Sequence, residues 1–184
     1  MKILAIDPSL THLGWAKSWD GEITYGVVKP PAPNGNPKAA LARLLMLREA
    51  VLLAAQGMDL VVLEGYAYGA QGRAIVSLGE LGGVLRLAFF EKDVPVLEVP
   101  PSNLKIFATG KGTSKKPELM AAAFKRLAYQ GSDEHEVDAL WLLALARYHY
   151  DELPPRFVPL GHLRGLDKLH YPFPRTHPAL GSRP

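Results

Sequence analysis

The sequence predicts an α/β fold with one mixed five-stranded sheet, in which three antiparallel strands are followed by parallel strands and helices cover both faces. Two observations lead to this prediction. First, three strand-like runs open the chain, and the second and third are separated by Asp20-Gly21, a dipeptide favoured in tight hairpins. Second, helix-like and strand-like stretches alternate after the proline-rich residues 29–37, as they do in βαβ units.

Each element follows from hydrophobic periodicity and from the residues that break it. Short apolar runs bounded by Gly, Pro or Asp predict strands at Lys2–Asp7, Leu13–Trp19, Glu22–Val28, Leu60–Glu64 and Val94–Val99. Apolar residues at helical spacing predict helices at Lys38–Gln56, Ile75–Glu91, Pro100–Thr109, Pro117–Tyr129 and Glu134–Tyr150. Residues 1–150 are therefore expected to form one folded domain. The basic tail at 151–184 is rich in Pro and His, and we expect it to be extended or partly disordered.

Composition limits the chemistry that this chain can support. The formal net charge of +3 is compatible with nucleic-acid binding but does not require it. The chain has no cysteine, so disulfides and thiolate metal sites are excluded, and any metal must be held by oxygen or imidazole. No apolar run reaches membrane-spanning length and the N-terminus does not have the pattern of a signal peptide. We expect a cytoplasmic protein that does not associate with membranes.

Acidic residues end two of the predicted strands. Asp7 ends the first and Glu64 ends the fourth, and a right-handed crossover would place these strands side by side and parallel. Both carboxylates would then lie at the sheet edge where α/β proteins bind ligands. His135 and Asp138 stand three residues apart at the start of the last predicted helix, so they share one helix face.

Three carboxylates and one imidazole at this edge would hold two divalent ions, which activate water in phosphodiester hydrolysis. For each residue taken alone, a structural explanation competes. Acids at strand ends are commonly solvated, and acids in a first helical turn interact favourably with the helix dipole. The combination of the four residues in this order of elements favours the metal site.

Five motifs together resemble the RuvC-type Holliday-junction resolvases, over roughly residues 1–150. They are Ile6-Asp7-Pro8-Ser9-Leu10-Thr11-His12-Leu13-Gly14, Val62-Leu63-Glu64-Gly65-Tyr66, Leu78-Gly79-Glu80-Leu81-Gly82-Gly83, the stretch from Val99 through Lys105 to Lys116, and His135-Glu136-Val137-Asp138-Ala139-Leu140. Each motif is short, and their order and spacing carry the match. The resemblance implies an RNase H-like fold, a homodimer, and symmetrical nicking of four-way DNA junctions with Mg²⁺. We expect two ions per site, with Mn²⁺ able to substitute.

The resemblance also implies roles for individual residues. Asp7, Glu64, His135 and Asp138 would be the catalytic set, with Lys105 and Lys116 near the scissile phosphate. The sequence departs from the family at Asp7-Pro8-Ser9, where most bacterial members have Asp-Pro-Gly and phage-encoded relatives often have Ser. It departs again at His135, where many members have Asp. A phage-encoded protein would act in the host cytoplasm, alongside recombination or packaging machinery, and the scarcity of thermolabile residues is typical of thermophilic proteins.

Further residues are expected to contact DNA. Lys105, Lys111, Lys115 and Lys116 form a basic stretch of the kind that binds phosphate backbones, and Tyr66 and Tyr68 follow Glu64 in a loop where a ring could stack on an unpaired base. Packing is the competing role of the tyrosines. Gly79, Gly82 and Gly83 allow a close helix–helix approach, which places the dimer interface on the helix Ile75–Glu91, although packing on the sheet would use the same glycines.

Two other functions remain open from the sequence. The chain could be another RNase H-like nuclease that acts on RNA–DNA hybrids, flaps or RNA. It could also be a branched-DNA-binding protein without catalytic activity, which is disfavoured because all four expected metal positions carry ligand side chains.

Overall fold

The computed structural model describes residues 1–65 and 73–174. Its strands are β1 (Ile3–Asp7), β2 (Leu13–Trp19), β3 (Glu22–Val28), β4 (Leu60–Glu64) and β5 (Val96–Val99). Its α-helices are α1 (Pro37–Ala54), α2 (Arg73–Glu91), α3 (Pro101–Thr109), α4 (Lys116–Arg126) and α5 (Glu134–His149). The order of elements predicted from the sequence is confirmed, with boundaries that differ by a few residues.

The five strands form one mixed sheet in the order β3-β2-β1-β4-β5. β1 is antiparallel to β2, and β2 to β3, whereas β1–β4 and β4–β5 are parallel pairs. Asp20 and Gly21 both have positive φ, at 50° and 89°, as a two-residue primed hairpin turn requires. The predicted mixed sheet is therefore present, and its central strand β1 is the one that ends in Asp7.

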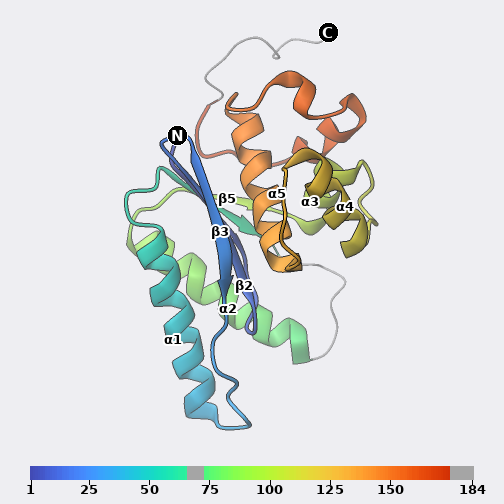
Figure 1. Cartoon of the computed structure of the whole chain (residues 1–184). Coiled ribbons are helices and arrows are strands. Elements are labelled where there is room, and N and C mark those ends of the chain that lie inside the picture. The colour runs from blue at the N-terminus through green and yellow to red at the C-terminus, as the bar shows by residue number, and fades with distance from the viewer. Residues whose placement is uncertain (66–72, 175–184) are drawn as a thin grey trace.

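Helices cover both faces of the sheet, with α1 and α2 on one side and α5, α3 and α4 on the other (Figure 1). Successive side chains of β1 point to opposite faces of the sheet, so β1 contributes to the hydrophobic core on each face. Ile3 and Ala5 pack with the α5 side, and Leu4 and Ile6 pack with the α1 and α2 side. No helix of residues 1–65 and 73–174 has the length and apolar character needed to cross a membrane.

The segment after α5 is folded in its first part. Residues 151–174, which we name the C-terminal strap, contain two 3₁₀ helices, η1 (Pro155–Phe157) and η2 (Leu160–Leu166). The prediction of an extended or partly disordered tail is wrong for these residues. Prolines do prevent long helices here, but apolar side chains between them pack on the core beside α5, namely Leu153, Phe157, Leu163, Leu166, Leu169, Tyr171 and Phe173. The division of the chain at residue 150 stays a prediction, and residues 175–184 lie outside the described part.

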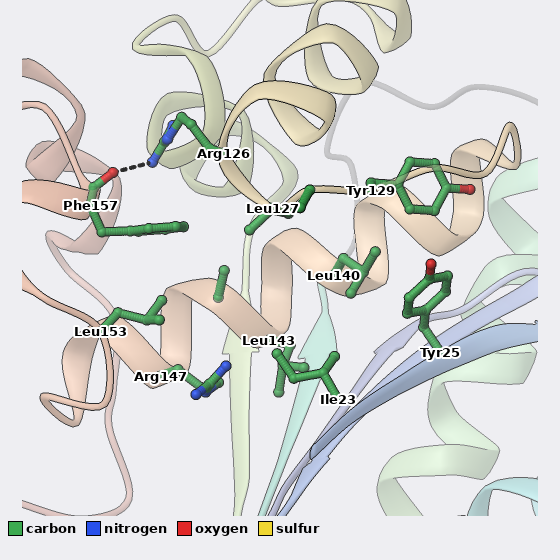
Figure 2. Close-up of a pocket in the computed structure, with 12 residues that line it drawn as sticks. Ile23, Tyr25, Arg126, Leu127, Tyr129, Leu140, Leu143, Arg147, Leu153 and Phe157 are labelled. Carbon is green, nitrogen blue, oxygen red and sulfur yellow. Dashed lines mark hydrogen bonds between the residues drawn. The ribbon is translucent and has the colours of Figure 1, made fainter. Parts of the chain in front are cut away.

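A hollow of about 340 Å³ lies where the strap meets α5 and β3 (Figure 2). Its walls are mostly apolar, with Ile23, Leu140 and Leu153 among them. Arg126 closes one end, where its guanidinium donates to the Phe157 carbonyl at 3.1 Å. None of the described residues that line the hollow is acidic, and the predicted acids Asp7, Glu64 and Asp138 are not among them.

Candidate active site

Asp7 and Glu64 lie at the same edge of the sheet. β1 and β4 are parallel and in register, with Ile6 opposite Leu63, so the next residues of the two strands are neighbours. Both strands are buried, and the Asp7 residue is only 7% exposed. The expected juxtaposition of the two strand-terminal acids therefore follows from the parallel pairing itself.

The first turn of α5 completes the cluster. Asp133 caps this helix, and its side chain accepts a hydrogen bond from the His135 backbone N–H at 2.9 Å. His135 Nδ1 lies 2.6 Å from Asp7 Oδ2. Asp138 follows one turn later on the same face, and its charge interacts with that of Asp7. The start of α5 thus lies beside the sheet edge, and Glu64, His135 and Asp138 all interact with Asp7.

Gly14 explains how α5 can approach the strand ends so closely. It pairs with Asp7 in the β1–β2 ladder. A Cβ added to Gly14 would lie 2.1 Å from the His135 carbonyl oxygen, a separation that no side chain could tolerate. The glycine in the first motif is therefore required where β2 meets the first turn of α5.

Burial and neighbouring carboxylates shift the pKa values of the acids in the cluster. Burial, and then the charge of Asp7 and a hydrogen bond with it, raise the pKa of Glu64 well above its usual range. Burial and the charge of Asp7 raise the pKa of Asp138 to about 7. The hydrogen bond to Asp7 raises the pKa of His135, against the effect of its burial. Without a cation, burial and the charge of Asp7 therefore favour the protonated forms of Glu64 and Asp138.

Two of the four predicted lysines stand beside the acids. Lys105 on α3 acts on Glu64, and its positive charge partly offsets the rise in the pKa of that carboxyl. Lys116, the first residue of α4, acts in the same sense on Asp138. Lys111 and Lys115 are exposed on the loop before α4, and they are not among the largest influences on either acid. Tyr66 and Tyr68 lie outside the described residues.

Two residues near the cluster were not singled out from the sequence. The His12 ring lies parallel to the His135 ring, with centroids 5.6 Å apart and an interplanar angle of 4°. Glu134 forms an ion pair with Lys116. His12 falls within the first motif, and the acid at residue 134 is explained locally by the helix dipole. His12 contacts a residue 123 positions away, and Glu134 contacts one 18 positions away. No local sequence pattern could have identified either contact.

The donor set fits a divalent cation in its chemistry. Three carboxylates and one imidazole are oxygen and nitrogen ligands, and raised carboxyl pKa values mark a place where positive charge would be stabilising. Within residues 1–65 and 73–174, no three His, Asp or Glu side chains already surround one point as metal ligands do. Asp7 and His135 instead form a hydrogen bond with each other.

Comparison with known proteins places this chain in a family. No family model matches the chain. A RuvC crossover junction endodeoxyribonuclease of Thermomicrobium roseum is 28% identical over 158 residues, which cover 82% of this chain and 94% of that protein. The corresponding Mycobacterium tuberculosis protein is 30% identical over 158 residues, or 81% of each chain. The solved structure of Thermus thermophilus RuvC in complex with a Holliday junction substrate superposes with a TM-score of 0.65, at 26% identity, over 80% of this chain and 94% of that one. With 30% identity over four-fifths of its length and the same fold, this chain belongs to the RuvC family of crossover junction endodeoxyribonucleases.

Proposed function

We propose that this chain is a structure-selective endonuclease that cuts four-way DNA junctions by paired hydrolysis of phosphodiester bonds. The observation that carries the proposal is the convergence of Asp7, Glu64, His135 and Asp138 at one sheet edge. The family relationship supports the same activity, because the relatives are named for cutting crossover junctions and one of them is seen with a Holliday junction.

The direct test is incubation of the purified protein with a labelled synthetic four-way junction, with and without Mg²⁺. We expect two symmetric nicks in the junction, only when the metal is present. Matched linear duplex, flap, RNA–DNA hybrid and RNA substrates separate the alternatives. Cleavage of the hybrid in preference to the junction would make the protein a different RNase H-like nuclease. Binding without cleavage of any substrate would make it a branched-DNA-binding protein.

We propose that the four residues hold two Mg²⁺ ions, with Mn²⁺ able to substitute. Metal ions at such a site supply a nucleophile from water and offset charge on the leaving oxygen. The chain's own cations complete the chemistry. The charges of Lys105 and Lys116 act on Glu64 and Asp138, which supports a role in which both ammonium groups approach the scissile phosphate and stabilise the negative charge that develops there.

The raised pKa of Asp138 should be visible in the pH dependence of stability, without any measurement of cleavage. An acid with a pKa raised to about 7 in the folded protein binds its proton more tightly there than in the unfolded chain. The stability contributed by that proton is lost as pH rises from about 4 to 7. Asp138→Asn should therefore raise the Tm of the metal-free protein at pH 8 and change it little at pH 4, with a gain on the order of 2 kcal/mol.

Calorimetry with chelator present measures this difference, and the same scan with Mg²⁺ tests the site. Mg²⁺ should stabilise the wild type more than Asp138→Asn. Asp93→Asn, at an exposed turn after α2, is the matched control and should show the same Tm difference at both pH values. A Tm gain for Asp138→Asn that is independent of pH would contradict the charge crowding.

His135 should set the metal preference. Imidazole is a softer ligand than carboxylate and suits transition metals better than Mg²⁺, so the wild type should be at least as active with Mn²⁺ as with Mg²⁺. His135→Asp should keep activity and shift preference toward Mg²⁺, whereas His135→Ala should lose most cleavage. Rates with each metal, together with Mn²⁺ binding by calorimetry, measure the effect. His12→Ala is the control and should leave the Mn²⁺-to-Mg²⁺ ratio unaltered. The same ratio in all three variants would show that His135 is not a ligand.

We propose that the protein is a homodimer that pairs through α2, because two cuts across a junction need two active sites. Val76, Leu87 and Phe90 are 62%, 57% and 83% exposed, and their spacing of 11 and 3 residues puts them on one helix face. Gly83 is exposed on this helix, whereas Gly82 is buried in the same subunit. Apolar side chains exposed in such a row are stabilised by a second copy.

Phe90→Glu should convert the dimer to a monomer, because it puts a charge into the apolar interface. Light scattering at micromolar concentration measures the mass, and a nicking assay should show that paired cuts are replaced by single ones. Leu160→Glu is the matched control, because it makes a similar change at a residue of the strap that is 76% exposed. It should leave the mass of the dimer unchanged. A wild-type protein that is monomeric at these concentrations would refute the dimer.

A further inference from the structure

The C-terminal strap follows one fixed course over α3. The Asn103 side-chain amide donates to the carbonyl oxygens of Gly165 and Asp167, both at 3.0 Å. Arg164 donates from Nη2 to the Gly110 carbonyl at 2.6 Å. A Cβ on Gly165 would lie 2.7 Å from the Asn103 carbonyl oxygen, so only glycine allows this contact. The strap is therefore held in place by hydrogen bonds at more than one point along α3.

This course brings exposed cations of the strap to two positions, one beside the loop before α4 and one beside the sheet edge where Asp7 and Glu64 lie, which we name the active edge. At the end of α3, Arg164 contacts Gly110, which begins the loop that carries the exposed Lys111 and Lys115. At the other position, Lys168 lines a hollow with Gly65, the residue that directly follows Glu64. The strap thus adds positive charge beside the basic loop and beside the edge where the acids meet.

Nearby acids weaken this positive charge without cancelling it. Glu98 lines the same hollow as Lys168, but Arg86 holds its carboxylate with two hydrogen bonds, and this contact lowers the pKa of Glu98. Asp167 is exposed and precedes Lys168 directly in the chain. His170 lines the hollow as well and is exposed. Asp167 is therefore the acid that competes with an anionic ligand of the strap.

We propose that the strap is a DNA-contacting element, in which Arg164 and Lys168 bind backbone phosphates of a duplex arm extending from the active edge. Exposed cations bind such phosphates through counterion release, without reading the base sequence. Phe157, Tyr171 and Phe173 of the strap pack on the core, so these rings are not available to stack on bases and the exposed cations are the groups suited to DNA. The proposal takes the identity of the ligand, DNA, from the proposed function.

Lys168→Asn is the sharpest test. Lys168 has a φ of 61°, in the left-handed region that Asn adopts more readily than Lys, so the variant removes the charge without adding strain. Arg164→Gln removes the second charge and retains a donor for the Gly110 carbonyl. Asp167→Asn removes the competing acid. Lys92→Asn, at an exposed turn after α2, is the matched control.

Binding is measured over a range of salt concentrations on a labelled four-way junction and on linear duplex, with divalent metal chelated. Lys168→Asn and Arg164→Gln should each weaken binding and reduce the slope of log K against log salt by about 1. Asp167→Asn should tighten binding, a result that a purely structural role of the strap does not produce. Lys168→Asn and Arg164→Gln should both lower the affinity by a larger factor than the single-turnover cleavage rate at saturating enzyme, as expected for contacts to the phosphates of a duplex arm.

Equal affinities and equal salt slopes for Lys168→Asn, Lys92→Asn and the wild type would overturn the proposal. Since Arg164→Gln could disturb folding, Lys168→Asn decides this outcome alone. Failure of the proposed function is a separate result, because it would appear as a wild-type protein that neither prefers nor cuts the junction. In that case the salt slopes on linear duplex would still show whether the strap contacts DNA.

Discussion

Asp7→Asn and Glu64→Gln should each abolish cleavage of a four-way junction while leaving junction binding intact. The two carboxylates lie at the end of neighbouring parallel strands, where the proposed metal ions are held. The loss in cleavage rate should be on the order of a thousandfold, the scale expected when an essential charge-stabilising group is removed. Binding should be unchanged or tighter, because each substitution removes negative charge close to the DNA phosphates.

Single-turnover rates and binding isotherms on the same junction measure the two effects separately. Asp93→Asn and Glu22→Gln are matched controls, since they make the same chemical changes at exposed positions away from the cluster. Near-normal cutting by either Asp7→Asn or Glu64→Gln would show that the catalytic site lies elsewhere. Lost binding with lost cleavage would instead indicate a misfolded variant, which circular dichroism would detect.

Gly14→Ala should be nearly as damaging, although residue 14 has no side chain to take part in chemistry. The added Cβ would lie 2.1 Å from the His135 carbonyl oxygen, so the first turn of α5 has to move away from β2. Overpacking of this kind costs about 1–3 kcal/mol of stability. Displacement of a catalytic group by about 1 Å can cost on the order of a hundredfold in rate. We therefore expect a modest fall in Tm and a large fall in cleavage.

Gly26→Ala on the neighbouring strand β3 is the matched control. The three atoms nearest to its Cβ would all belong to the Trp15 ring, at 3.1 Å and beyond, and a side chain can shift where a backbone carbonyl cannot. This variant should keep most of its cleavage activity. A Gly14→Ala protein that cuts at the wild-type rate would mean that the position of His135 does not depend on the close packing of β2 and α5.

Much of the fold could be predicted because its signals are local. The Asp20-Gly21 turn, the alternation of strands and helices after residue 37, and the buried runs that end in Asp7 and Glu64 all depend on neighbouring residues. The spacing of His135 and Asp138 fixes their common helix face in the same way. Given one parallel pairing, the sequence was sufficient to bring Asp7 and Glu64 together. The packing of α5 on β2, which brings His135 to Asp7, depends on long-range contacts.

The strap shows why the rest could not be predicted. Its 3₁₀ helices are three and seven residues long, too short for a hydrophobic period to appear. What stabilises them is contact with α3 and the core, such as the hydrogen bonds of Asn103 to residues more than 60 positions away. Prolines mark where a helix is excluded, but they carry no information about which distant surface the chain will cover.

The sequence by itself determined which residue types are available for catalysis and the order of the elements that carry them. Only the tertiary structure decided which groups are partners: His135 with Asp7, Lys116 with Glu134, and Gly14 with the first turn of α5. It also decided which carboxyls are crowded enough to have a raised pKa, namely Glu64 and Asp138. The physical reason is that periodicity and turn chemistry act over a few residues of chain, whereas burial and Coulomb interactions depend on distance in space.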